Sequence, residues 1–155
     1  MILSGQAIHL RHKRCGFVAA NVEMKILKKV IQQMACHARQ EAPLEACGYL
    51  ASKDALILAA YPLANIDKSN EHFSFDPKEQ FAAVKDARAK GWEICAVYHS
   101  HPASPARPSQ EDIKLAYDPD ISYFIVSLTG GKEEVRAFLI KNSVVTPIEL
   151  EVVED

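Results

Sequence analysis

The sequence predicts one α/β domain with a mixed, largely antiparallel sheet flanked by helices, and three observations support this class. The chain has 155 residues, which is the usual size of a single compact domain. Segments with helical spacing of apolar residues alternate with short apolar runs of strand length. Several of these runs follow one another with only a tight turn between them, which is typical of antiparallel pairing.

The first helical pattern predicts a helix from Asn21 to about Arg39. Asn21 is the expected N-cap, Glu23 suits the first turn, and Pro43 limits the helix at its other end. The apolar residues of this pattern are Met24, Leu27, Val30, Ile31, Met34 and Ala35. Residues 1–18 show no clear period, so we expect an N-terminal extension or edge strand there and a domain at 19–155.

Two strands and a long polar segment are expected next. Apolar runs at 47–51 and 55–61 flank Ser52-Lys53-Asp54, which predicts a hairpin. The polar segment Asn65 to Asp76 is too long for a tight turn, so we expect a functional loop.

A second helix is expected after this loop. Asp76 is its predicted cap and Pro77 its first residue. The apolar residues Phe81, Val84 and Ala87 continue the helical pattern toward Gly91, where we expect the helix to end.

The second half of the chain begins with a strand from Trp92 to Tyr98, with His99-Ser100-His101 at its end. Residues 102–108 contain three prolines and predict a stiff loop. A short helix is expected to begin at Ser109. The last three strands are expected at 122–128, 134–140 and 144–151.

The two histidines predict a metal site. Side chains two residues apart on a strand share a face, with Cα atoms roughly 6.5–7 Å apart, so His99 and His101 can reach one ion. Asp112 would lie in the first turn of the short helix, which the proline-rich loop can fold back over the strand. Two histidines and one carboxylate form a catalytic zinc set with one position left for water.

Simpler interpretations of these residues stay open. A histidine near a strand end is more often a surface or core residue than a ligand. Ser109 and Asp112 also fit an ordinary helix start, with the serine as N-cap and the acid favoured by the helix dipole.

Two stretches resemble one known family. His99-Ser100-His101-Pro102 with Ser109 and Asp112 resembles the JAMM motif of the MPN+ (JAB1/MPN/Mov34) metallopeptidases. The stretch Pro43-Leu44-Glu45-Ala46-Cys47-Gly48-Tyr49-Leu50 is similar to the P-x-E-x-C-G-x-L stretch of that family at every fixed position. The similarity extends from about residue 20 to 150 and includes Asn65, Ser69, Phe73 and Asp76-Pro77. It implies an MPN-like (cytidine-deaminase-like) fold.

The resemblance also implies roles for individual residues. One zinc ion per chain would be bound by His99, His101 and Asp112, would lower the pKa of its bound water, and would polarise the scissile carbonyl. Glu45 would be the general base that takes the proton of this water and passes it to the leaving amine. The hydroxyl of Ser109 would hydrogen-bond the developing oxyanion.

Other nucleophiles are disfavoured. Ser100 would have no oriented base if both neighbouring histidines bind metal. Cys47 and Cys95 would need a partner histidine, and the obvious ones are already assigned to the metal.

The implied substrate is a ubiquitin-like sulfur carrier protein with a C-terminal Gly-Gly tail, as for small prokaryotic members of this family. Cleavage would hydrolyse the peptide or isopeptide bond after that tail. We expect the tail to bind in extended form at a sheet edge near residues 65–75. Phe73 and Phe75 of this segment fit a core role equally well.

Two other functions are weighed against the peptidase. A catalytically silent MPN scaffold would generally lose the metal ligands, all of which are present here. A JAB-domain protein of the DNA-repair type is disfavoured by the near-neutral charge and by the missing helix-hairpin-helix extension.

Composition and charge narrow the function classes. The formal net charge is -2, the pI is about 6.3, and the only basic cluster is Arg11-His12-Lys13-Arg14, which disfavours a nucleic-acid partner. No apolar run approaches the roughly 18 residues of a membrane span, and Met1-Ile2-Leu3 is followed by polar residues, so we expect a cytoplasmic protein without a membrane partner.

The four cysteines form no C-x-x-C pair, so neither a zinc-ribbon site nor a thioredoxin-type redox pair is indicated. Cys47 and Cys95 lie in apolar stretches, where a reduced cysteine packs as a small hydrophobe, which favours a reducing cytosol. A chain of this size can build its core without disulfides or a structural metal, so a metal would serve chemistry rather than folding. The oligomeric state stays open.

Overall fold

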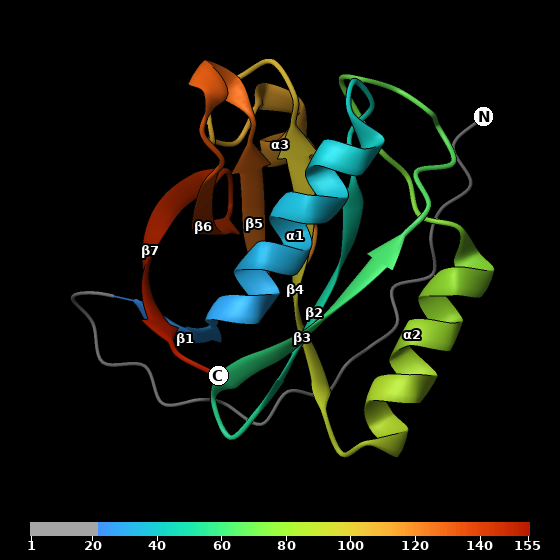
Figure 1. Cartoon of the computed structure of the whole chain (residues 1–155), viewed down its shortest axis with the longest axis vertical. Helices are drawn as coiled ribbons and strands as arrows, with labels where there is room; N and C mark the ends of the chain where they lie inside the picture. Colours follow the sequence, from blue (N-terminus) through green and yellow to red (C-terminus); the bar gives the residue numbers. More distant parts are fainter. Residues whose placement is uncertain (1–21) are drawn as a thin grey trace.

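The structure is a computed structural model that describes residues 22–155, so the expected extension at 1–18, Asn21 and the basic cluster at 11–14 lie outside the described part. Figure 1 shows helices packed against a strongly curved sheet. The helices and strands in chain order are β1 (Glu23–Leu27), α1 (Lys28–Glu41), β2 (Cys47–Lys53), β3 (Leu56–Leu63), α2 (Pro77–Ala89), β4 (Glu93–His101), α3 (Gln110–Leu115), β5 (Ser122–Ser127), a 3-10 turn (Thr129–Gly131), β6 (Glu134–Lys141) and β7 (Val144–Val153).

The sheet is mixed and closes on itself. Its strand order is β1-β3-β2-β4-β5-β6-β7, and β1 pairs with β7 to complete the barrel. The pairs β1–β3, β1–β7 and β4–β5 are parallel, whereas the remaining four pairs are antiparallel. The predicted class, an α/β domain with a mixed and largely antiparallel sheet, is confirmed.

The start of the first predicted helix is wrong. Residues 23–27 form strand β1, in which Lys25 pairs with Leu56 on one side and Glu151 on the other, and α1 begins only at Lys28. Met24 and Leu27, expected on the helix, belong to this strand. Leu27 occupies the N-cap position and makes no side-chain cap. Within a segment of only five residues, the spacing of the apolar side chains fits a strand as well as a helix. The sequence pattern alone therefore could not distinguish the two structures.

The second helix begins as predicted. Asp76 caps α2 by accepting a hydrogen bond from the backbone N–H of Lys78 at 2.8 Å, and Pro77 is the first helical residue. Phe81 was expected on the apolar face of this helix, but its side chain is 67% exposed. The buried face of α2 consists instead of Ala83, Val84 and Ala87.

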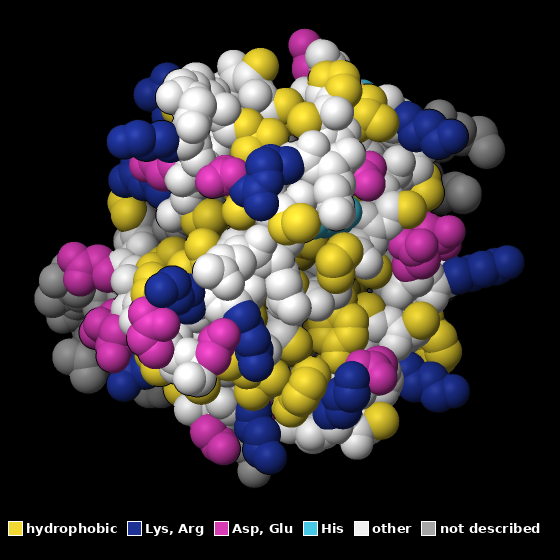
Figure 2. Space-filling view, in the orientation of Figure 1, with side chains coloured by type: hydrophobic (Ala, Val, Ile, Leu, Met, Phe, Trp, Pro, Cys, Tyr) yellow, Lys and Arg dark blue, Asp and Glu magenta, His cyan; other side chains and the backbone are white. Residues whose placement is uncertain are grey.

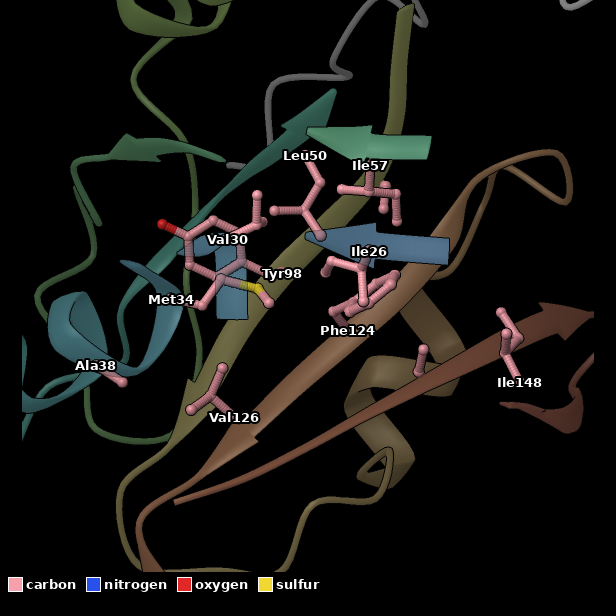
Figure 3. Close-up of a cluster of buried hydrophobic side chains, with 12 residues drawn as sticks. Ile26, Val30, Met34, Ala38, Leu50, Ile57, Tyr98, Phe124, Val126 and Ile148 are labelled. Carbon is pink, nitrogen blue, oxygen red and sulfur yellow. The ribbon is translucent and has the colours of Figure 1, made fainter. Parts of the chain in front are cut away.

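The largest core cluster fills the barrel beneath α1 (Figure 3). It joins Ile26 of β1 and Met34 of α1 to Tyr98 of β4 and Phe124 of β5, all of them fully buried. β4 crosses this core and runs on through His101, three residues further than the sequence predicted, because β2 and β5 pair with it as far as its histidines. The core therefore holds in place the strand that carries them.

The described surface carries charges of both signs. On the face shown in Figure 2, Lys and Arg side chains are interspersed with Asp and Glu, and apolar side chains are visible between them. None of the helices formed by residues 22–155 has the length and apolar character needed to cross a membrane.

Candidate metal centre

Two buried histidines at the end of β4 form the centre of the site. Strand pairing fixes both: His99 lies opposite Cys47 of β2 and Ile125 of β5, and His101 lies opposite Ser127. The residues are 3% and 5% exposed. Their Nε2 atoms lie 3.0 Å apart, so the two rings point to one location.

Asp112 reaches the same location from α3. Its Oδ1 lies 3.2 Å from Nε2 of His99, and its Oδ2 lies 3.2 Å from Nε2 of His101. A capping box holds this carboxylate: the Ser109 N–H donates to Oδ2 at 2.8 Å, and the Ser109 Oγ accepts from the Asp112 N–H at 3.0 Å. The structure thus brings together the three residues that the sequence predicted as ligands.

The loop at 102–108 sets the orientation of one imidazole. The backbone oxygen of Pro105 can only accept, and it lies 2.8 Å from Nδ1 of His101. The Nδ1 atom therefore carries a proton, which leaves Nε2 of the neutral ring as the lone pair that faces the site. Hydrogen bonds from Ser127 Oγ at 2.7 Å and Thr129 Oγ1 at 3.0 Å to the oxygen of Ser104 fix the loop in turn.

Glu45 lies beside the histidines, two residues before β2. Its residue is 4% exposed, and its Oε2 is buried without a hydrogen-bond partner among the described residues. Carboxylate and imidazole ligand atoms of Glu45, His99 and His101 lie within 4.8 Å of one another. An unpaired buried carboxylate oxygen is costly, so one beside two histidines indicates a partner such as a cation or a bound water.

The donor set fits a zinc ion. In the neutral ring, Nε2 of His101 is a hydrogen-bond acceptor, and it faces Nε2 of His99 and the oxygens of Asp112. The lone pairs of these atoms repel one another unless a proton or a cation lies between them. Two imidazoles and a carboxylate match the ligand preference of zinc. Both carboxylates are placed to be the third ligand: the Asp112 oxygens lie 3.2 Å from the two Nε2 atoms, and a Glu45 oxygen lies within 4.8 Å of both imidazole ligand atoms.

The pKa directions agree with a site of concentrated charge. Burial raises the pKa of Glu45 more than the nearby His99 and His101 lower it. Burial alone would lower the pKa of His101, but its hydrogen bonds to Asp112 and to the Pro105 oxygen outweigh this and raise it. Burial opposes the charge of Asp112 as well, yet the hydrogen bonds that the histidines donate to it from Nε2 when protonated hold its pKa well below the usual range.

The alternative nucleophiles serve structural roles. Ser100 is fully buried, and its Oγ accepts a hydrogen bond from the Ala46 N–H at 2.8 Å, while its own N–H donates to the Ala46 oxygen at 2.9 Å. Burial raises the pKa of the Cys47 thiol to about 12 and that of Cys95 to about 11, so neither is a thiolate near neutral pH. Sequence reasoning rejected Ser100 as a nucleophile but missed its contact with Ala46, beside Glu45.

The polar segment 65–75 folds against the site. The ring of Phe73 stacks on the ring of His99, with centroids 4.9 Å apart and planes at 27°. Phe75 packs on Tyr49 at 5.0 Å and belongs to the periphery of a core cluster. The two phenylalanines therefore differ: Phe75 contacts the core, whereas Phe73 covers a histidine of the site.

Comparison with known proteins places these residues in a family context. A family profile described as prokaryotic homologs of the JAB domain matches residues 27–141, a range that includes every predicted site residue. The fold is also that of solved JAB1/MPN domains, which confirms the predicted MPN-like class.

Individual relatives have similar lengths. A Mycobacterium tuberculosis protein named CysO-cysteine peptidase is 33% identical over 128 residues, which cover 81% of this chain and 88% of that protein. A Thermus thermophilus protein named probable TtuB-protein conjugate cleaving protease is 32% identical over 112 residues, which cover 72% of each chain. A solution structure of a Desulfitobacterium hafniense protein is 47% identical with a TM-score of 0.78, and the match covers 85% of this chain and 94% of that one.

Proposed function

The chain belongs to the family of prokaryotic homologues of the JAB domain, and from that premise we propose that it is a zinc-dependent peptidase acting on a ubiquitin-like carrier protein. Its reaction would hydrolyse the peptide or isopeptide bond that follows the Gly-Gly tail of the carrier. The observation that supports this most strongly is the convergence of two imidazoles and one carboxylate beside a second, unpaired buried carboxylate.

His99, His101 and Asp112 would hold one zinc ion in this proposal. The ion, when bound, acidifies a coordinated water and polarises the scissile carbonyl. Pro105 supports the site by fixing the tautomer of His101, as neighbours of metal-bound histidines usually do.

Glu45 and Ser109 would act on the substrate. Glu45 is buried and close to both histidines, and its Oε2 has no hydrogen-bond partner among residues 22–155, so its carboxylate can accept a proton from the attacking water and return it to the leaving nitrogen. The Ser109 hydroxyl already accepts the Asp112 N–H, and its own proton stays available to donate to the substrate oxyanion.

The names of the relatives support the substrate class. One acts on a cysteine attached to CysO and the other on TtuB conjugates, as their names state. We infer a carrier of the same kind for this chain, with a tail whose glycines allow the backbone to approach the site closely.

We infer that the tail binds in extended form beside the segment 65–75. From Ala59 to Leu63, β3 pairs with β2 on one side and with no described strand on the other, since its pairing with β1 ends at Ile57. The residue pair Asn65–Phe75 continues β-type pairing beyond β3 and leads to Phe73 at the site. Shortening this segment should raise KM for the carrier; unchanged turnover and KM would exclude the idea.

The decisive experiment is incubation of the zinc-loaded protein with Gly-Gly carriers that bear a C-terminal extension, a single attached amino acid or an isopeptide-linked protein. Mass spectrometry of the products should show cleavage directly after the second glycine for at least one class. A scaffold protein without catalytic activity would leave all three intact.

Glu45→Gln and Asp112→Asn separate the base from the ligands. Glu45→Gln should keep one zinc per chain and lose cleavage by about 100-fold or more, the usual contribution of general-base catalysis. Asp112→Asn should lose zinc as well. The matched control is Glu111→Gln, an exposed acid in the same turn, which should keep both properties. Loss of zinc in Glu45→Gln would identify Glu45 as a ligand instead.

A further inference from the structure

The side chain of Asn65 makes five hydrogen bonds with backbone groups next to the site. Its Nδ2 donates to the oxygens of Glu45 at 3.1 Å, His72 at 3.1 Å and Ser69 at 3.4 Å. Its Oδ1 accepts from the N–H groups of Asp67 at 3.1 Å and Ser74 at 3.3 Å. One amide group thus serves both the segment 65–75 and the residue that we propose as the base.

Among residues 22–155, the hydrogen bonds to the backbone of Glu45 come from that segment. Its N–H donates to the Ser69 oxygen at 2.9 Å, and its C=O accepts from Asn65. Glu45 precedes β2, so none of the described strands pairs with it. The next residue, Ala46, is bound on the other side by Ser100, between the two histidines. The position of the Glu45 carboxylate relative to the histidines therefore depends on two contacts. One is the hydrogen bond from Asn65 to the Glu45 oxygen, and the other is the pairing of Ala46 with Ser100.

We propose that Asn65 is a positioning residue that sets the Glu45 carboxylate against the metal site and couples it to the segment 65–75. This inference rests on the proposed function, in which Glu45 is the general base and this segment lies beside the substrate tail. Ordering of that segment by a bound tail would then also order Glu45, because both are joined through the same amide group. Asn65 acts through Glu45 and needs no contact with the substrate.

Asn65→Asp tests the donor half of the amide group. The substituted side chain keeps an oxygen that can accept from Asp67 and Ser74, but it loses the donor and faces three carbonyl oxygens with a carboxylate. We expect Glu45 to move while the turn around Asp67 persists. Asn142→Asp, an identical change at an exposed turn between β6 and β7, is the matched control.

Two readouts are required, one of which is independent of activity. In Asn65→Asp, kcat should fall by about 10- to 100-fold, as expected for a catalytic group displaced by roughly an ångström, with zinc content close to that of the unaltered protein. Hydrogen exchange should become faster at the Glu45 amide, whose partner Ser69 loses a contact, while the Asp67 amide stays protected. Asn142→Asp should change neither.

Each outcome decides the inference. A kcat within threefold of the unaltered protein, or unchanged exchange at the Glu45 amide, would overturn the positioning role. If the unaltered protein cleaves no carrier, the proposed function fails, and the exchange measurement alone then decides whether Asn65 holds Glu45. If Asn65→Asp does not fold, Asn65→Ala replaces it, because it removes the donor without adding a charge, and the same criteria apply to Glu45.

Discussion

The hydroxyl of Ser109 has two uses that a pair of substitutions can separate. It caps α3 by accepting the Asp112 N–H, and we propose that it donates to the substrate oxyanion. Alanine at an N-cap costs about 1 kcal/mol of stability, whereas glycine costs only a few tenths. We therefore expect Ser109→Ala and Ser109→Gly to lose cleavage equally, by about 100-fold, but only the alanine variant to lose about 1 kcal/mol in urea unfolding.

The comparison of the two variants can also contradict the proposed role of Ser109 as a donor to the oxyanion. If Ser109→Gly keeps most of its activity while Ser109→Ala does not, the serine matters as a helix cap that places Asp112. Zinc content should be measured in parallel, because a misplaced Asp112 would bind the ion less tightly.

The residues of the site were largely predictable from sequence, whereas their supports were not. The spacing of His99 and His101 on a strand and the short distance to Asp112 restrict their geometry strongly, and the structure brings them together as expected. Pro105 acts through a backbone oxygen, which any residue type possesses, so composition gives no signal for it. Asn65 contacts Glu45 twenty residues away, a contact that depends on the path of the intervening hairpin.

At the scale of elements, contacts between residues far apart in the sequence also explain the wrong prediction at β1. The short strand exists because β3 and β7 provide partners on both sides, and β7 is more than a hundred residues distant in sequence. Local apolar spacing at 24–35 could not reveal such partners. The helix α2 was predicted well because its cap and first residue, Asp76 and Pro77, specify its start locally.

Strand β2 depends on a glycine at position 48. A Cβ atom there would meet the Tyr61 oxygen at 2.3 Å and the ring of Tyr98 at 2.5 Å, and Tyr98 is fully buried. Neither a paired backbone nor a packed ring can give way easily. We expect Gly48→Ala to lower the free energy of unfolding by about 3 kcal/mol, at the upper end of overpacking costs, as measured by urea denaturation.

Gly91→Ala is the control for this substitution. Gly91 has a φ of +72°, and no atom lies within 4 Å of a Cβ built there. The cost should be only the backbone strain, about 1–2 kcal/mol. If Gly48→Ala destabilises the protein no more than Gly91→Ala does, β2 can move away from its neighbours to make room for the methyl group. The steric reason for a glycine at position 48 would then be wrong.

The packing of α1 on β4 should make stability depend on pH. His37 of α1 lies 2.8 Å from the Tyr98 hydroxyl through its Nδ1, and burial lowers the pKa of His37 more than the nearby Glu41 raises it. The unfolded chain then binds a proton at a higher pH than the folded protein does. The free energy of unfolding should fall as pH drops below the ordinary value of 6.5 and level off below the folded pKa.

Urea unfolding of the unaltered protein and His37→Gln between about pH 8 and pH 5 measures this contribution. The variant should be less stable at the upper end, because it loses the contact with Tyr98, and should show a shallower decline below pH 6.5. Parallel curves for the two proteins would mean that His37 contributes nothing to the pH dependence.

For the molecule as a whole, the site lies directly against the apolar core, which holds its segments in place. The core clusters are formed by apolar side chains of the barrel, α1 and α2, and close to the site they include Ala106 of the loop at 102–108, against which Ile113 of α3 packs. The site is formed by three segments that this core fixes: the residues before β2, the end of β4 and the start of α3. A chain of this size buries enough apolar surface to fold without a metal.

Removal of the metal should therefore abolish cleavage and leave the fold intact. A bound ion stabilises only the folded state, by about 4 kcal/mol when its concentration is a thousand times Kd, so chelation should lower the melting temperature by several degrees. The far-UV circular dichroism of the chelated protein at 25 °C should match that of the zinc-loaded protein, and added zinc should restore activity. Loss of secondary structure on chelation would show that the ion has a structural role. This would contradict a coordination position kept open for water, and the peptidase proposal depends on that open position.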